Sequence, residues 1–105
     1  MKPGKRDKKY HILITGKELQ EMKRYVYTMA ESFGLDRRVM QYQGKRPLGL
    51  YRWDIECLLD TIADEIQRPE NYPSQECEEY QAFSNLHRRL QDIYREIERE
   101  DVQRK

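Results

Sequence analysis

The stretch GKRPLGLYRWD, residues 44–54, combines chain-breaking residues with side-chain types that are common at binding surfaces. It holds three cations, a tyrosine and the only tryptophan: Lys45, Arg46, Tyr51, Arg52 and Trp53. Cations interleaved with aromatic rings suit phosphates and stacked bases, and Trp, Tyr and Arg are also enriched at protein–protein hot spots. The alternative is structural, with Gly44 as a helix stop, Pro47 as a breaker, and Leu48, Leu50 and Trp53 as core anchors. The burial of Trp53 stays open at this point.

The segment YTMAESFGLDRRVMQYQGKR, residues 27–46, carries a more specific spacing. An alanine lies four residues before the turn glycine Gly34, apolar residues flank the turn, and Met40 occupies the first inward place of the next segment. The segment resembles the helix-turn-helix template of bacterial DNA-binding proteins, although the last apolar place of that template falls on Gln43. The resemblance implies a recognition helix over 36–43 that presents Arg37, Arg38 and Gln41 to base edges. An ordinary helical hairpin with solvated arginines is the alternative.

Acidic residues recur in the second half of the chain on either side of a proline-bounded turn, at Glu56, Asp60, Asp64, Glu65, Glu76, Glu78 and Glu79. Several carboxylates together can hold Mg²⁺, as in small all-α nucleotide pyrophosphatases. The chain lacks their paired acidic motifs and a phosphate loop, so a solvated acidic face is the preferred interpretation. A magnesium-dependent all-α nucleotide hydrolase remains a second alternative for function.

The two cysteines and two histidines, Cys57, Cys77, His11 and His87, fit no zinc-binding signature. No glycine-rich phosphate loop and no nucleophile elbow is present. We therefore expect no metal, no cofactor and no catalytic residue, and hence a protein that is not an enzyme.

Charge is divided unevenly along the 105 residues, although the net charge is only +1. Residues 1–53 hold 13 lysines and arginines against 5 acidic residues, whereas residues 54–105 hold 7 against 14. The two halves either attract each other within one fold, or the basic half faces an anionic partner or the acidic half of another copy.

The length allows one domain with a modest core. No apolar leader and no membrane-spanning window is found in the sequence, and two cysteines are too few for a disulfide scaffold. These observations favour a soluble cytoplasmic protein without membrane contact.

The N-terminal segments predict a basic, disordered tail over 1–9 followed by an extended arm with the sequence YHILIT. Because one strand cannot stand alone, this arm either packs against the domain or pairs with a second copy. Thr15 and Glu18 have the spacing of a capping box, and Ile14 and Leu19 that of a hydrophobic staple. A helix is therefore expected to begin after Thr15, and Gly34 is expected to end it.

Apolar periodicity predicts three further helices. A short helix over about 36–43 should turn Val39 and Met40 inward, and a third helix should run from about Leu50 to Gln67. Ser74 is the expected cap of a last helix of roughly 28 residues, about 40 Å long. Its inward residues step by three and four as in a heptad seam: Phe83, Leu86, Leu90, Ile93 and Ile97.

We therefore expect an all-α fold, a single helical domain over 10–105 in which four helices surround one core, with a long C-terminal helix and an extended N-terminal arm. The leading functional interpretation is a small non-enzymatic protein-interaction module, a homodimer through the arm or the last helix. The alternative is a helix-turn-helix DNA-binding protein. The residues expected to contact a protein partner or nucleic acid are Arg37, Arg38, Gln41, Lys45, Arg46, Tyr51 and Arg52.

Overall fold

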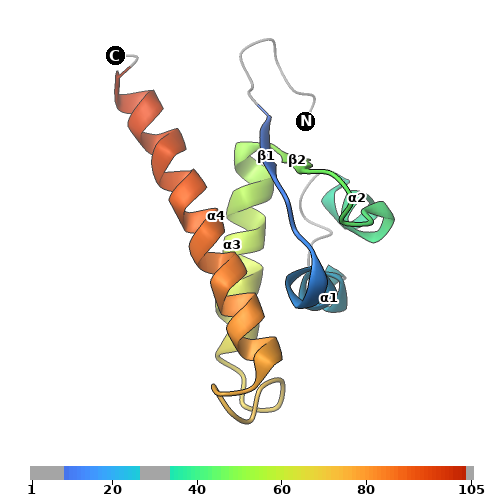
Figure 1. Ribbon diagram of the computed structural model, residues 1–105. Coiled ribbons are helices and arrows are strands. Elements are labelled where there is room, and N and C mark those ends of the chain that lie inside the picture. Colours follow the sequence, from blue (N-terminus) through green and yellow to red (C-terminus); the bar gives the residue numbers. More distant parts are fainter. Residues whose placement is uncertain (1–8, 27–33, 104–105) are drawn as a thin grey trace.

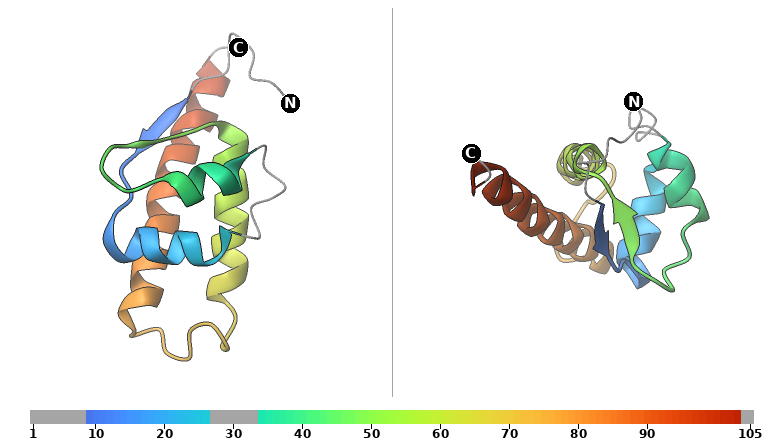
Figure 2. Two further views of the ribbon diagram at one scale, coloured as in Figure 1. Left: turned by 90° about the vertical axis from the view of Figure 1, so that its right-hand side faces the viewer. Right: turned by 90° about the horizontal axis from the view of Figure 1, so that it is seen from above.

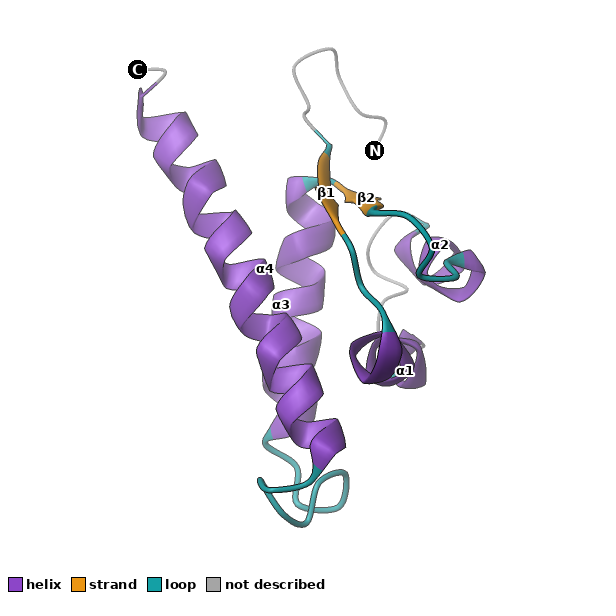
Figure 3. Ribbon diagram, in the orientation of Figure 1, coloured by secondary structure: helices purple, strands orange, loops and turns teal. Residues whose placement is uncertain are grey.

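Two long antiparallel helices form the main body of the protein in the computed structural model, which describes residues 9–26 and 34–103 (Figure 1). They are α3 (Arg52–Ile66) and α4 (Glu78–Gln103). Two shorter helices, α1 (Gly16–Arg24) and α2 (Leu35–Gln41), lie on one side of this pair (Figure 2). The expected all-α fold of four helices with a long last helix is confirmed for the described residues, apart from one very small sheet (Figure 3).

The N-terminal arm finds its partner within the same chain. Strand β1 (Tyr10–Ile12) pairs antiparallel with β2 (Leu48–Leu50), so that His11 lies opposite Gly49. Ile12, Leu48 and Leu50 are buried, whereas His11 is exposed. Of the two predicted alternatives, the arm therefore packs against its own domain. Its pairing with 48–50 was not predicted, because these residues were assigned to the approach of the third helix.

Helix α1 begins where the sequence predicts, but its expected capping contact is absent. Thr15 is the N-cap residue with an extended backbone, yet its side chain makes no capping hydrogen bond. The Glu18 carboxylate accepts hydrogen bonds from Asn85 and Arg89 of α4 instead. An ion pair to α4 therefore replaces the local capping box.

The end of α1 differs from the expectation. The helix stops at Arg24, and Tyr25 is its C-cap residue, so it does not run continuously to Gly34. Met29, Ala30 and Phe33 lie outside the described residues, as do most of the residues of the predicted helix-turn-helix turn. Gly34 has φ of 77° and precedes α2, where a left-handed backbone suits glycine.

Helix α2 confirms the short second helix, with one wrong assignment. Val39 is buried as predicted, but Met40 is 57% exposed. Adjacent residues on a helix point about 100° apart, so a helix of seven residues that buries Leu35 and Val39 turns Met40 to solvent.

Helix α4 begins at Glu78, four residues after the cap predicted at Ser74. The Ser74 hydroxyl accepts a hydrogen bond from the Glu76 backbone N–H in the preceding turn. The heptad interpretation is otherwise confirmed, since Phe83, Leu86, Leu90 and Ile97 are buried and Ile93 is half-buried. Within one chain, this seam packs on α3 and α1.

No helix in the described part of the chain is both long and apolar enough to cross a membrane.

Candidate partner-binding surface

Most cations of the described chain have a carboxylate beside them. Lysine or arginine nitrogens lie within 4.0 Å of acidic oxygens at eight positions: Lys17, Arg24, Arg38, Arg52, Arg68, Arg89, Arg95 and Arg99. Lys23 and Arg88 instead donate to the Met40 carbonyl and the Asn85 side chain. These ten side chains are occupied by neighbours from the same chain.

Four cations have neither an ion pair nor a side-chain hydrogen bond to a described residue, and we call them the basic surface: Lys9, Arg37, Lys45 and Arg46. All four are exposed, and they come from the residue before β1, from α2 and from the loop over 42–47. The segments that carry them meet because β1 pairs with β2, which directly follows that loop. Unneutralised positive charge is thereby gathered on one side of the molecule.

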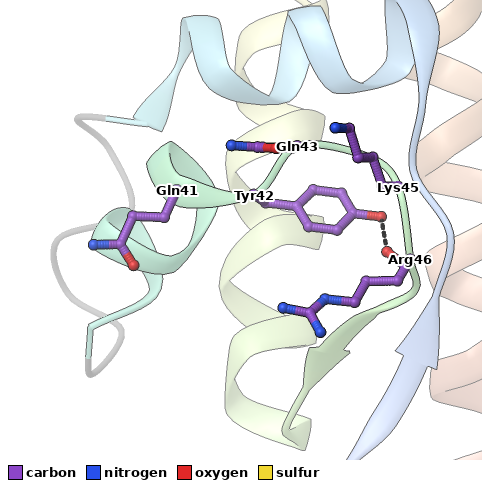
Figure 4. A pocket seen from close by; sticks show the side chains of 5 residues that line it. All are labelled: Gln41, Tyr42, Gln43, Lys45 and Arg46. Carbon is purple, nitrogen blue, oxygen red and sulfur yellow. Dashed lines mark hydrogen bonds between the residues drawn. The ribbon is translucent and has the colours of Figure 1, made fainter.

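The loop over 42–47 is held firmly beneath this surface. The buried Tyr42 hydroxyl donates to the Arg46 carbonyl at 2.6 Å and accepts from the Ile14 backbone N–H at 3.2 Å. Gly44 has φ of 75°, and its backbone lies against Leu19 and the Ile14 carbonyl. Lys45 and Arg46 therefore project from a fixed backbone, on opposite sides of the Tyr42 ring in the view of Figure 4.

Two adjoining pockets lie at the basic surface. The first, of about 520 Å³, is lined by Gln41, Tyr42, Gln43, Lys45 and Arg46. The second, of about 640 Å³, shares Gln41, Tyr42 and Arg46 with the first. Its other lining residues come from α2 and from the two strands and the residues directly before them: Lys9, His11, Arg38, Pro47, Leu48 and Gly49. Neither pocket has a carboxylate in its lining.

The structure brings four of the seven predicted contact residues to these pockets: Arg38, Gln41, Lys45 and Arg46. Arg37 is exposed one helical turn before Gln41 on α2. Tyr51 and Arg52 line neither pocket. Sequence reasoning missed Lys9 and His11, because it placed Lys9 in the disordered tail and could not see the pairing of the strands.

Arg38 differs from the other cations at the pockets. Its guanidinium lies 2.7 Å from the carboxylate of the fully buried Asp54 and also donates to the Gly49 carbonyl at 3.3 Å. Asp54 in turn accepts a hydrogen bond from the Tyr51 backbone N–H at the start of α3. Arg38 therefore joins α2 to β2 and α3, and it brings little unneutralised charge to the pocket.

Tyr51, Arg52 and Trp53 line neither pocket, although the Lys9 ammonium lies over the Tyr51 ring, 5.4 Å from its centroid. The Tyr51 and Trp53 rings stack with their centroids 4.8 Å apart, and both residues are half-buried. Arg52 pairs with Glu56 and lies over the Tyr94 ring of α4. Trp53 is thus neither the core anchor of one interpretation nor a fully exposed platform, while Leu48 and Leu50 are core residues as expected.

The acidic residues of the described chain do not converge. Glu56, Asp60 and Asp64 are exposed along α3, and no group of three or more His, Cys, Asp or Glu side chains among the described residues could hold a metal ion. Cys57 and Cys77 form no disulfide bond, and both are half-buried. The described chain offers no arranged donor set for the magnesium chemistry of the second alternative.

Comparison with protein-family models, with curated proteins and with solved structures found no match.

Proposed function

We propose that this protein is a non-enzymatic interaction module that binds an acidic region of a partner protein through its basic surface. One observation carries the proposal: three of the four cations of the basic surface, Lys9, Lys45 and Arg46, line two pockets that have no carboxylate in their lining. An acidic segment would supply the missing negative charge, and complementary charge speeds encounter and sets orientation.

The test is capture of partners from an extract of native cells, followed by quantitative mass spectrometry. The bait is the full chain, compared with a Lys45→Ala/Arg46→Ala variant and with a control, Arg95→Ala/Arg99→Ala, that removes two exposed cations of α4. We expect a defined acidic protein to be captured by the wild type and the control, and to be lost with the first variant. Equal capture by all three baits would contradict the proposal.

The helix-turn-helix alternative has one observation in its favour. Arg37 and Gln41 are both exposed on α2 and are four residues apart, which places them on one helix face. Against it, α2 has only seven residues and Arg38 is paired with Asp54. Two results would favour this alternative. The first is loss of the captured proteins when the extract is treated with nuclease. The second is an affinity for DNA that falls steeply as the salt concentration rises and that depends on Arg37.

Self-association is the second part of the proposal. Leu13, at the end of the N-terminal arm, is 46% exposed, and it and Met40 are the exposed large apolar side chains of the described chain. A second copy that covered Leu13 would remove this apolar surface from water. We therefore propose a homodimer through the arm rather than through α4, whose apolar seam is already filled within one chain.

A further inference from the structure

The two pockets share one guanidinium. Gln41, Tyr42 and Arg46 line both, so Arg46 lies at their common boundary. An arginine carries five N–H donors in a planar fork and can serve acceptors on more than one edge. A ligand that enters both pockets would therefore meet Arg46 at its middle.

Each pocket adds its own donors to this shared residue. Lys45 and the side-chain amides of Gln41 and Gln43 line the first pocket. Lys9 and His11 line the second, together with Arg38, which is neutralised by Asp54. Each pocket thus presents at least two cations without a described carboxylate partner, one of them Arg46.

These donors are arranged in advance. The two hydrogen bonds of Tyr42 and the close packing of Gly44 fix the loop that carries Lys45 and Arg46. The aliphatic stem of Lys9 lies directly over Gly49, which has no side chain to displace it. Donors held in place before binding reduce the entropy lost when a ligand is bound.

We infer that the two pockets bind two neighbouring phosphoryl groups of a phosphorylated segment in the partner protein, with Arg46 between them. A phosphoryl group carries nearly two negative charges and three acceptor oxygens. It can therefore pair with two cations and accept a hydrogen bond from an amide at the same time, whereas a carboxylate has one charge and two oxygens. The inference rests on the proposed function, and it specifies the chemistry of the acidic region.

A peptide fits these pockets better than a single-stranded nucleic acid does. Binding of single strands relies on aromatic rings on which successive bases stack. The one tyrosine, tryptophan or phenylalanine in either lining is Tyr42, which is buried with its hydroxyl doubly hydrogen-bonded, so only the imidazole of His11 offers an exposed ring. Tyr51 and Trp53 stack on each other and lie outside both linings.

The test titrates the full chain, labelled with ¹⁵N, with inorganic pyrophosphate and with a short glycine–serine peptide that carries two phosphoserines. We expect saturable shifts at the backbone amides of Lys45 and Arg46 and at the side-chain amides of Gln41 and Gln43. Citrate, added at the same ionic strength, should bind at least about tenfold more weakly, since it offers carboxylates alone.

Variants then assign the binding to the pockets. Arg46→Ala should weaken phosphopeptide binding about tenfold or more, and Arg46→Lys should recover part of the loss because it keeps the charge without the fork. Arg95→Ala is the control, since Arg95 is exposed on α4 and lies in neither pocket. Unchanged binding by Arg46→Ala would overturn the inference.

Other outcomes separate this inference from the proposed function. If citrate equals pyrophosphate, or if phosphatase treatment of the extract leaves Lys45- and Arg46-dependent capture unchanged, the phosphoryl inference fails while the proposed function stands. If the phosphopeptide binds through Arg46 but no protein is captured, the proposed function fails instead. An oligothymidylate that binds through the same residues as tightly as the phosphopeptide would overturn the choice of a peptide.

Discussion

Arg38 is a residue type that commonly binds partners, but its side chain stabilises the fold. It is a predicted contact residue and lines a pocket, but its guanidinium is bound to the buried Asp54 and to the Gly49 carbonyl. Removing one partner of a buried ion pair leaves an uncompensated charge, which costs more than the pair itself contributes. The neighbouring Arg37 has no such partner among the described residues and is exposed.

This difference predicts opposite effects for two adjacent arginines. Arg38→Ala should lower the free energy of unfolding by about 3 kcal/mol, because Asp54 loses its partner. Arg37→Ala should change it by less than about 0.5 kcal/mol, as is usual for exposed sites. Urea denaturation of both variants measures the two values, and equal losses would show that the Arg38–Asp54 contact is not the cause.

His87 on α4 predicts a specific loss of stability in acid. Burial lowers the pKa of its imidazole below the ordinary value of 6.5. Between the lowered pKa and the ordinary value, the unfolded chain binds more protons than the folded protein. The contribution of neutral His87 to stability is therefore fully present above about pH 6.5 and is lost as the pH falls below that value. His87→Gln should therefore lose less of its melting temperature between about pH 7.5 and about pH 5 than the wild type does.

The exposed His11 provides the matched control for this measurement. His11→Gln should keep the acid-induced loss of the wild type, because the argument depends on burial of the imidazole. If the wild type and His87→Gln lose the same melting temperature, the acid sensitivity comes from other groups.

At the scale of elements, the loop over 42–47 is the part of the chain on which the proposed site depends most. Its conformation is set by contacts from residues almost thirty positions earlier, since Ile14 and Leu19 pack against Gly44 and Ile14 also binds Tyr42. The loop would otherwise be a solvated connection whose cations had no fixed direction.

Gly44→Ala should damage this element more than a matched glycine does. A Cβ at Gly44 would lie 3.0 Å from Leu19 Cδ2 and 3.1 Å from the Ile14 carbonyl oxygen, in addition to the strain of φ at 75°. We expect a loss of about 2 kcal/mol in unfolding free energy, against about 1 kcal/mol for Gly16→Ala. Gly16 also has positive φ but open space around its Cβ position.

Calorimetry or urea denaturation of the two glycine variants measures this difference. The Gly44→Ala variant should also bind the proposed partner more weakly, because Lys45 and Arg46 follow directly. Equal losses for the two glycines would mean that the loop yields to the added methyl group.

At the scale of the whole molecule, opposite charges in the two halves are only partly used within the fold. Lys17 pairs with Glu78 and Glu79, Arg38 with Asp54, and Arg89 with Glu18, so ion pairs join the halves at several points. The basic surface is the remainder on one side, whereas the exposed Glu56 and Asp64 of α3 pair with Arg52 and Arg68. Attraction within the fold and attraction to a partner were the two alternatives that the sequence left open, and the structure is compatible with both.

The proposed homodimer predicts twice the monomer mass of 12.9 kDa in light scattering. Leu13→Ser should shift the protein toward the monomer, because the apolar contact through the arm is lost. Met40→Ser, which alters the other exposed large apolar side chain, should keep the mass of the wild type. A monomer mass for the wild type at the highest attainable concentration would exclude the dimer.

The sequence by itself determined the helical architecture. Steps of three and four between apolar residues mark α3 and α4 because helical periodicity is a local property that persists over several turns. The same reasoning placed Phe83, Leu86 and Leu90 in the core, and composition alone located the excess of cations in the first half. Boundaries were less secure, since Thr15 and Ser74 both have capping chemistry but only Thr15 begins a helix.

Only the tertiary structure decided which cations act together. A strand of three residues is too short to show alternation, so nothing in YHILIT or PLGLY announced that β1 and β2 pair across 35 intervening residues. That pairing brings Lys9 and His11 close to Arg46. The packing of α2 on β2 and α3 places Arg38 beside Asp54, with which it forms an ion pair. Charge neutralisation depends on distances in space, which residues far apart in the chain acquire only when the core has formed.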